Sequence, residues 1–380
     1  MAVFPMRIAL TLPSLAGGGA QRIFVDLAKG LLDRSLGVDL VLVRDEGPLR
    51  DSVPPGVEVV LLGGGPVSRA VPRLARYLRS RRPDVVVPAI SHMNLCALLA
   101  ARLVRPRVPV IVTHHNQLTL AARHGARPKD RVMPRLVRAG YPWADGVVAV
   151  SEGVAADLAA SARLPREKVQ VVYNPVDFER VGAAAAGPVG HPWLASKAAP
   201  VLVTAGRLTV QKDFATLLRA VALVGDVRLV VLGEGELRPD IERLARDLGI
   251  DDRVDLPGFC ANPYPWYRAA DLFVLSSRWE GLPTVLVEAL FLGVPVVATD
   301  CPSGPAEILA GGRWGRLVPV GDPEALAVAI TASLAEGRRP RDPAAWQPYS
   351  LDAVSERWVE ILAAASSGRR RPLERLRARP

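Results

Sequence analysis

The stretch RWEGLPTVLVEALFLGVPVVATD, Arg278 to Asp300, predicts a turn, a helix and a buried strand in succession. Pro283 favours the start of a helix, because the first helical residue needs no N–H donor. The apolar residues that follow continue the helix as far as Gly293, which can end it. The run Val294 to Thr299 is short, β-branched and uninterrupted, which is typical of a strand buried in a parallel sheet. The stretch therefore indicates an α/β fold.

Two glutamates eight residues apart, Glu280 and Glu288, frame this predicted helix. We expect Glu280 in the turn and Glu288 about two turns inside the helix. The free N–H groups at the helix start, near Pro283 and Thr284, form a site for a phosphate or diphosphate. Glu288 could then accept hydrogen bonds from a ribose, and Glu280 from a sugar beyond the phosphates. Taken alone, two glutamates so spaced are more often solvated surface carboxylates.

The spacing from Glu280 to Glu288 resembles the E-x7-E motif of the retaining, nucleotide-sugar-dependent glycosyltransferases of family 4. Ser277, the run GLPTVLVEAL and the segment G-x-P-V-V-A-T-D are similar to that family as well. The continuation CPSGPAEIL, Cys301 to Leu309, resembles its branch that builds bacterial polysaccharides, including lipopolysaccharide, and lipid-linked oligosaccharides. The resemblance implies the GT-B fold, in which two Rossmann-like, doubly wound domains with parallel sheets face each other across a cleft.

The length of 380 residues is too great for one ordinary core and predicts two or three domains. Residues 173–193 are rich in Gly, Ala and Pro, which indicates a linker. We therefore expect an acceptor-binding domain at 1–180 and a nucleotide-sugar-binding domain at 190–345. The resemblance implies a hinge at Asn174 to Asp177 and a last helix, about 350–365, that packs back onto the first domain. The basic tail, 366–380, is expected to be disordered.

Charge is unevenly spread along the chain. Residues 1–180 hold 25 Lys and Arg against 15 Asp and Glu, residues 181–365 hold 17 against 22, and the tail holds six against one. This asymmetry indicates an anionic partner for the first half. Two predicted helices place arginines beside apolar stripes, Arg69, Arg73 and Arg76 in one and Arg131, Arg135 and Arg138 in the other. Such faces suit peripheral contact with anionic lipid, as does the tail, although each stripe could instead meet the domain core.

The cysteines Cys96, Cys260 and Cys301 are scattered and form no CxxC pair, which indicates a reducing compartment and no thiolate metal site. The apolar run Ile8 to Leu12 leads straight into a glycine loop, so we interpret it as a first strand rather than a signal peptide. No apolar segment approaches the roughly 18–20 residues that span a bilayer. We therefore expect a cytoplasmic protein, either soluble or peripheral on the inner face of the membrane.

In the first half, Gly17, Gly18 and Gly19 link the first predicted strand to a helix and could let backbone N–H groups approach an anion. A bare tight turn explains the loop equally well, and the dinucleotide fingerprint is absent. The run VPVIVTHHNQ predicts a buried strand that ends in polar residues. In an open parallel sheet the ligand crevice lies beyond such ends. The resemblance implies that Gly18 and Gly19 face acceptor and donor phosphates, and that His115 contacts the donor sugar; the role of His114 stays open.

In the second half, Arg207 and Lys212 follow the predicted strand Val201 to Ala205, five residues apart. Arginine can bind phosphate oxygens bidentately and lysine adds a point charge, so the pair suits a diphosphate. Two surface cations would be the plainer interpretation, but the pattern G-R-L-x-x-x-K resembles that of the family. Gly233 and Gly235 end the next predicted strand, in a loop that resembles the one that approaches the nucleoside.

The resemblance implies a retaining hexosyltransferase that moves a sugar from a nucleotide diphosphate sugar to a glycan hydroxyl. A UDP-hexose or UDP-N-acetylhexosamine donor and a polyprenyl-diphosphate-linked acceptor are expectations from the CPSGP branch. The sequence holds no Asp-x-Asp, so we expect no catalytic metal and no further cofactor. The alternatives are a GT-B nucleotide-sugar epimerase, a non-catalytic nucleotide-sugar-binding subunit and a nucleic-acid binder. The basic helices have little of the aromatic interleaving that stacks on bases, which argues against the last.

Overall fold

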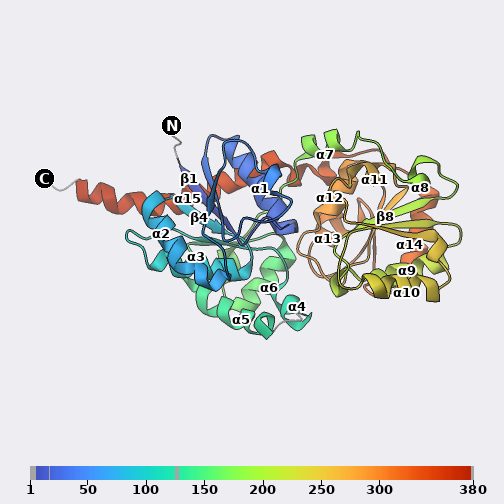
Figure 1. Ribbon diagram of the computed structural model, residues 1–380, viewed down its shortest axis with the longest axis horizontal. Coiled ribbons are helices and arrows are strands. Elements are labelled where there is room, and N and C mark those ends of the chain that lie inside the picture. Colours follow the sequence, from blue (N-terminus) through green and yellow to red (C-terminus); the bar gives the residue numbers. More distant parts are fainter. Residues whose placement is uncertain (1–5, 17, 125–127, 378–380) are drawn as a thin grey trace. The chain divides into compact units, whose positions relative to one another are not determined.

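The computed structural model describes residues 6–16, 18–124 and 128–377. The chain divides into two compact units, the first formed by Met1–Pro175 with Leu351–Pro380 and the second by Val176–Ser350. Each unit is a layered α/β body built on parallel strands (Figure 1). This confirms the expected fold class of two Rossmann-like bodies. The first unit ends inside the segment Asn174 to Asp177, where the sequence predicts the hinge.

The described residues of the first unit form seven parallel strands. Four form a sheet in the order β3-β2-β1-β4 and three form a sheet in the order β5-β6-β7. A bridge between Val86 and Val110 connects β4 to the segment before β5. Their bounds are β1 Arg7–Leu12, β2 Gly37–Leu42, β3 Glu58–Leu61, β4 Val85–Pro88, β5 Ile111–His114, β6 Gly146–Ala149 and β7 Val169–Val171.

Helices cover both faces of these strands (Figure 1). On one face α1 packs against α15, and on the other α2, α3, α5 and α6 follow one another, each packed on the next. Their bounds are α1 Gly19–Leu32, α2 Val71–Arg81, α3 Ser91–Arg102, α4 Leu118–His124, α5 Pro128–Gly140, α6 Glu152–Ala162 and α15 Leu351–Arg377. The helix α6 begins as the sequence predicts, since Ser151 caps it by accepting a hydrogen bond from the Val154 N–H.

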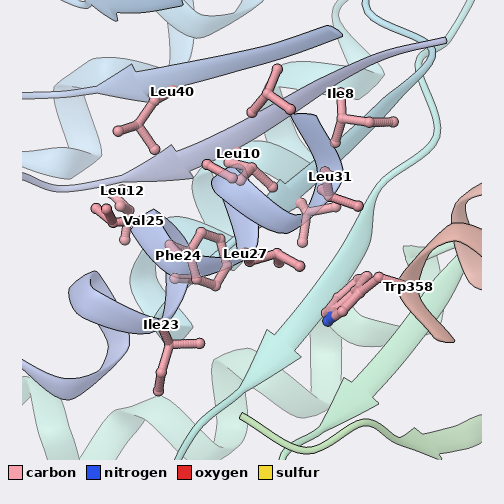
Figure 2. Close-up of a cluster of buried hydrophobic side chains, with 14 of the residues drawn as sticks. Ile8, Leu10, Leu12, Ile23, Phe24, Val25, Leu27, Leu31, Leu40 and Trp358 are labelled. Atoms are coloured by element: carbon pink, nitrogen blue, oxygen red, sulfur yellow. The ribbon is translucent and has the colours of Figure 1, made fainter. Parts of the chain in front are cut away.

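The core of the first unit lies between β1, α1 and α15. Phe24 and Leu27 of α1 pack on Leu10 of β1, and Trp358 brings α15 into the same cluster (Figure 2). The two helices can approach closely because a Cβ at Gly30 of α1 would lie 1.9 Å from the Ser355 hydroxyl of α15. The close packing of α1 and α15 explains why the last helix belongs to the first unit.

The helix α15 is longer than the sequence predicts. It continues to Arg377, whereas the expected helix ended near residue 365 and left a disordered tail. The expectation of disorder for residues 366–377 is therefore replaced by a helix, and residues 378–380 lie outside the described part of the chain. Arginine, leucine and glutamate are good helix formers and make up most of this segment, in which the helix continues past Gly368 and Pro372.

The second unit has one sheet of six parallel strands in the order β10-β9-β8-β11-β12-β13. The strands are β8 Val201–Ala205, β9 Arg228–Leu232, β10 Val254–Gly258, β11 Leu272–Leu275, β12 Val296–Thr299 and β13 Arg316–Val318. The helices are α7 Phe178–Ala184, α8 Pro192–Ala195, α9 Phe214–Leu223, α10 Arg238–Asp247, α11 Tyr264–Ala269, α12 Thr284–Phe291, α13 Pro305–Ile308 and α14 Pro323–Glu336. Its core lies between the central strands, α9, α10 and α14.

The segment interpreted as a linker holds two short helices of the second unit, α7 and α8. Asp177 caps α7 by accepting a hydrogen bond from the Arg180 N–H. The Phe178 ring stacks on Phe291 with centroids 4.6 Å apart. The cap, the ring contact and the alanines of the segment all favour a helix, despite Gly182.

The helix of the opening stretch is shorter than predicted. Pro283 is the N-cap of α12 rather than its first helical residue, and the helix begins at Thr284. Glu288 therefore lies about one turn inside the helix, not two. The predicted end is close to the observed one, because Gly293 has the left-handed φ of 72° that a residue beyond a helix end often adopts.

Candidate functional site

The site residues predicted in the second unit lie at one edge of its sheet. Arg207 and Lys212 follow β8, Gly233 follows β9, and Glu280 follows β11. These three strands are neighbours and parallel, so their carboxyl ends meet at the same edge. The sequence predicted each residue at a strand end, and the sheet order brings them together.

Glu280 is at the centre of a hydrogen-bond network. Its Oε1 accepts hydrogen bonds from Lys212 Nζ at 2.6 Å and from Ser277 Oγ at 2.6 Å. Gln211 Nε2 lies 3.4 Å from the other carboxylate oxygen and donates to the Trp279 carbonyl at 3.0 Å. The Glu280 side chain is only 7% exposed and that of Lys212 is 17% exposed. Glu280, predicted to bind the sugar, and Lys212, predicted to bind the diphosphate, thus form a largely buried ion pair.

The CPSGP segment, Cys301 to Pro305, packs on the turn that carries Glu280 and stabilises it. The Glu280 N–H donates to the Pro302 carbonyl at 3.3 Å. Gly304 adopts a φ of 92°, and a Cβ there would lie 2.5 Å from Pro283 Cδ. Only glycine fits this position, since its backbone is left-handed and a larger residue would press on the start of α12. This segment, which the sequence linked only to a family branch, supports the site.

Gly233 and Gly235 pack directly on the loop that carries Arg207. A Cβ at Gly233, whose φ is 144°, would lie 2.0 Å from the Gly206 carbonyl oxygen, and a Cβ at Gly235 would lie 2.4 Å from that of Leu208. Hydrogen bonds also join the two loops, including one from the Leu208 N–H to the Glu234 carbonyl at 3.0 Å. Both glycines therefore hold the loops after β8 and β9 together.

The other predicted residues of this edge are more open. Arg207 is exposed, and Glu288 is half-buried in α12. Burial, and to a smaller extent the Glu288 carboxylate, raises the pKa of Tyr267. The start of α12 has no side-chain cap, because Pro283 is its N-cap. A helix start without a side-chain acceptor presents N–H groups that an anion can satisfy.

In the first unit, Gly18 precedes α1, and a side chain of the same helix contacts His115. Gly18 is the extended N-cap of α1 without a side-chain hydrogen bond, and Gly19 is the first helical residue. Gly17 lies outside the described residues. The Phe24 ring of α1 meets the His115 ring edge-on, with centroids 5.7 Å apart. The glycine loop and the histidine predicted at the end of β5 thus belong to one local assembly.

Thr113 determines which nitrogen of His115 carries the proton. The Thr113 hydroxyl lies 2.7 Å from the Pro88 carbonyl oxygen, which can only accept a hydrogen bond. The hydroxyl proton is therefore used, and Thr113 Oγ1 accepts a hydrogen bond from His115 Nε2 at 2.9 Å. The imidazole proton is on Nε2, and Nδ1 is an acceptor. Nδ1 is buried and has no hydrogen-bond partner within the described part of the structure.

His115 is uncharged at neutral pH. Burial, with a smaller contribution from His114, lowers its pKa to about 3, although a hydrogen bond with the Asn174 side chain acts in the opposite direction. A neutral imidazole whose Nδ1 is an acceptor can accept a hydrogen bond from a hydroxyl. It cannot contribute a positive charge to a phosphate site.

His114, whose role the sequence left open, is part of the interior. Its Nδ1 lies 3.3 Å from the Tyr141 hydroxyl, which also accepts a hydrogen bond from Asn94 Nδ2 at 2.7 Å. Burial lowers the pKa of His114 to about 4. These contacts join β5, α3 and the short helix Tyr141–Trp143 (η3), so His114 stabilises the first unit. Among the described residues, no cluster of three or more His, Cys, Asp or Glu side chains could hold a metal ion.

Family models and individual relatives that match this chain all describe glycosyltransferases. Residues 17–180 match the family described as Glycosyltransferase Family 4, and residues 199–336 match the one described as Glycosyl transferases group 1. The chain is 30% identical over 321 residues to the lipopolysaccharide core biosynthesis glycosyltransferase LpsD of Rhizobium meliloti, covering 82% of this chain and 84% of that protein.

A second relative is an enzyme of Campylobacter jejuni. It is the N-acetylgalactosamine-N,N'-diacetylbacillosaminyl-diphospho-undecaprenol 4-alpha-N-acetylgalactosaminyltransferase. It is 29% identical over 336 residues, which cover 83% of this chain and 86% of that enzyme. Among solved structures, Anabaena HepE in complex with UDP-glucose is similar with a TM-score of 0.78 at 21% identity, over 94% of this chain and 100% of that one. This structural likeness shows a shared fold.

Proposed function

Because the chain belongs to glycosyltransferase family 4 and has the GT-B fold, we propose that it moves a sugar from a nucleotide diphosphate sugar to a glycan hydroxyl with retention of anomeric configuration. The observation that carries this proposal is the edge of the second unit where the loops after β8, β9 and β11 meet. That edge combines cations, a buried carboxylate and the uncapped start of α12.

The donor would bind along this edge. Arg207 and Lys212 would contact the diphosphate together with the N–H groups near Pro283 and Thr284, and Glu288 would accept hydrogen bonds from the ribose. The loops held together by Gly233 and Gly235 would lie next to the nucleoside. Support comes from the exposure of Arg207 and from the missing side-chain cap of α12.

The ion pair of Lys212 with Glu280 gives donor binding a specific consequence. A diphosphate would compete with Glu280 for the Lys212 ammonium group, which now lies 2.6 Å from the carboxylate. A carboxylate released from lysine can accept hydrogen bonds from the hydroxyls of the transferred sugar. Ser277, which donates to the same oxygen, would keep the carboxylate in place during this exchange.

The acceptor would bind the first unit near Gly18, Gly19 and His115. The acceptor Nδ1 of His115 suits a hydroxyl donor, from either the acceptor or the transferred sugar. Attack from the face of the leaving group would produce retention, with a donor phosphate oxygen taking the proton of the acceptor hydroxyl. Arg207 and Lys212 would stabilise the charge that develops on the leaving diphosphate. We expect this reaction to need no metal ion.

The relatives indicate the substrate class. The Rhizobium protein is a lipopolysaccharide core glycosyltransferase, and the Campylobacter enzyme takes an acceptor that is linked to diphospho-undecaprenol. HepE was solved with UDP-glucose. We propose a UDP-hexose or UDP-N-acetylhexosamine donor, a lipid-linked glycan acceptor in cell-surface polysaccharide synthesis, and action at the cytoplasmic face of the membrane. No helix of the described residues has the length and apolarity needed to cross a bilayer.

The test is a panel of nucleotide sugars incubated with the protein and a membrane extract, followed by mass spectrometry of the lipid fraction. A mass increase of one sugar with one donor supports the proposal. Conversion of the sugar nucleotide without extract would indicate an epimerase, and calorimetric binding without product would indicate a non-catalytic subunit. Arg207→Ala, Lys212→Ala and Glu280→Ala should each lower turnover at least about tenfold. Near-wild-type rates in all three would overturn the site assignment.

A further inference from the structure

The exposed large apolar side chains of the first unit are concentrated on neighbouring helices. Five of the six that are found among its described residues lie on α5, on η3 and at the C-terminal end of α3. They are Leu99 and Leu103 of the α3 end, Val132 and Leu136 of α5, and Trp143 of η3, between 38% and 58% exposed. We call this surface the α3/α5 face.

The helices α3 and α5 are adjacent in the outer helix layer of the first unit (Figure 1). A Cβ at Gly140, the last residue of α5, would lie 2.6 Å from Leu95 Cδ2 of α3. The apolar side chains that point away from this contact are therefore not needed to hold the two helices together. They form a surface that the described residues leave open to solvent.

The helix α2 differs from α5, although the sequence gave both the same pattern. Leu74 and Leu78 of α2 are fully buried, so its apolar stripe meets the domain core. The prediction of a lipid-facing stripe on α2 is therefore wrong. Among the large apolar side chains of α5 whose burial is described, Val137 is fully buried, whereas Leu136 is 46% exposed beside Arg135. Only the second of the two predicted helices keeps apolar side chains at the surface.

The charge around the α3/α5 face is strongly positive. From Ser68 to Asp145 the sequence holds fifteen Arg and Lys against three Asp and Glu. Asp84 accepts a hydrogen bond from the Arg7 N–H, and Asp145 forms an ion pair with Arg107. The exposed arginines on the two helices themselves are Arg102, Arg131, Arg135 and Arg138.

Trp143 has the setting of an aromatic residue at a membrane interface. Its ring is 38% exposed, and the Arg102 guanidinium lies over it, 4.3 Å from the centroid. Tryptophan next to a cation favours the headgroup level of a bilayer, where one part of the pair is apolar and the other is hydrated.

We propose that the α3/α5 face binds an anionic lipid bilayer, with its arginines on the phosphates and its leucines and tryptophan at the level of the upper acyl chains. Apolar side chains interspersed with arginine and nearly free of carboxylates match such a surface. An ordinary protein partner would need acidic side chains around an apolar centre. The proposal deepens the proposed function, because a lipid-linked acceptor is presented at a membrane, but the binding itself needs no sugar transfer.

The test is co-sedimentation of the full chain with vesicles of phosphatidylglycerol and phosphatidylcholine, compared with vesicles of phosphatidylcholine alone. We expect binding to the first and at least about tenfold weaker binding to the second, with the difference reduced by salt. The double variant Leu103→Ser/Leu136→Ser should weaken binding at least about tenfold, because both side chains lose their apolar contact with lipid. Val328→Ser is the matched control, since Val328 is 70% exposed on α14 of the second unit and should bind like the wild type.

Folding and transfer activity are controlled separately. Because the substituted leucines are exposed, the double variant should keep the wild-type melting temperature, and it should transfer sugar normally to an acceptor dissolved in detergent. Equal binding by the double variant and the wild type would overturn the proposal. So would a dimer in analytical ultracentrifugation that the double variant abolishes, because the face would then join two copies of the chain. Loss of detergent-supported transfer in the wild type would count against the proposed function and not against this surface.

Discussion

Replacing Glu280 by glutamine removes one negative charge and almost no volume. Lys212 Nζ and Ser277 Oγ each lie 2.6 Å from the same carboxylate oxygen, and the Lys212 and Glu280 side chains are 17% and 7% exposed. An amide oxygen can accept both hydrogen bonds, but it carries no negative charge, so the ion pair with Lys212 is lost and Ser277 donates to a neutral acceptor. A hydrogen bond to a charged group contributes about 1.5–3 kcal/mol and a neutral one about 0.5–1.5 kcal/mol. We therefore expect the unfolding free energy of the second unit to fall by about 1–2 kcal/mol.

A loss of this size should lower the melting temperature by about 2–8 °C for a unit of this length. Turnover at saturating donor should fall at least about tenfold, about 1.4 kcal/mol of barrier, because the amide is a weaker acceptor for the sugar hydroxyls. Differential scanning calorimetry and initial rates measure the two effects. Glu242→Gln is the control, since Glu242 pairs with Arg238 at 2.8 Å on the exposed face of α10. If Glu280→Gln matched this control in both measurements, the role assigned to the buried pair would be refuted.

Three further predictions concern the loops and the histidines. Gly233→Ala should raise the donor KM at least about tenfold in steady-state kinetics, because its Cβ would lie 2.0 Å from the Gly206 carbonyl oxygen and would part the two loops. Thr113→Val removes the acceptor of His115 Nε2–H, so imidazole ¹⁵N shifts should report a mixture of tautomers, whereas Thr113→Ser should keep the Nε2–H form. Burial lowers the pKa of His114 to about 4 and of His115 to about 3. The unfolded chain therefore takes up these protons first, and urea titrations should show the unfolding free energy falling below about pH 6.5, by about 1.4 kcal/mol per pH unit per histidine. The His115→Gln variant should lose about half of this slope.

The sequence predicted the fold class and most strands of the three sheets because buried parallel strands are short, β-branched and bounded by glycine or polar residues. The strand Val201 to Ala205 was predicted with the bounds that the structure has. The strand β4 and the helix α3 were not predicted. The strand β4 is short and has prolines close to both ends, so it shows no clear alternation. The helix α3 packs between α2 and α5 and is apolar on most sides, so it shows no clear helical periodicity.

The candidate site was predicted as a set of residues at strand ends, but not as a network. Lys212 and Glu280 are 68 residues apart, and only the order of the strands brings β8 beside β11. No local pattern indicates that a lysine will bind a particular carboxylate across a sheet edge. The same holds for Thr113 and Pro88, whose hydrogen bond determines the tautomer of His115 and depends on the end of a neighbouring strand. Family resemblance predicted the residues, and packing determines the pairing of Lys212 with Glu280 and the tautomer of His115.

The central claim is that a nucleotide diphosphate sugar binds at the carboxyl edge of β8, β9 and β11. Hydrogen–deuterium exchange of the full chain, with and without saturating UDP, tests it most directly. We predict slower exchange in peptides covering residues 206–212, 233–236 and 280–288, and no comparable change in α10 or α14. Protection confined to other segments, with these three unchanged at saturation, would contradict the account.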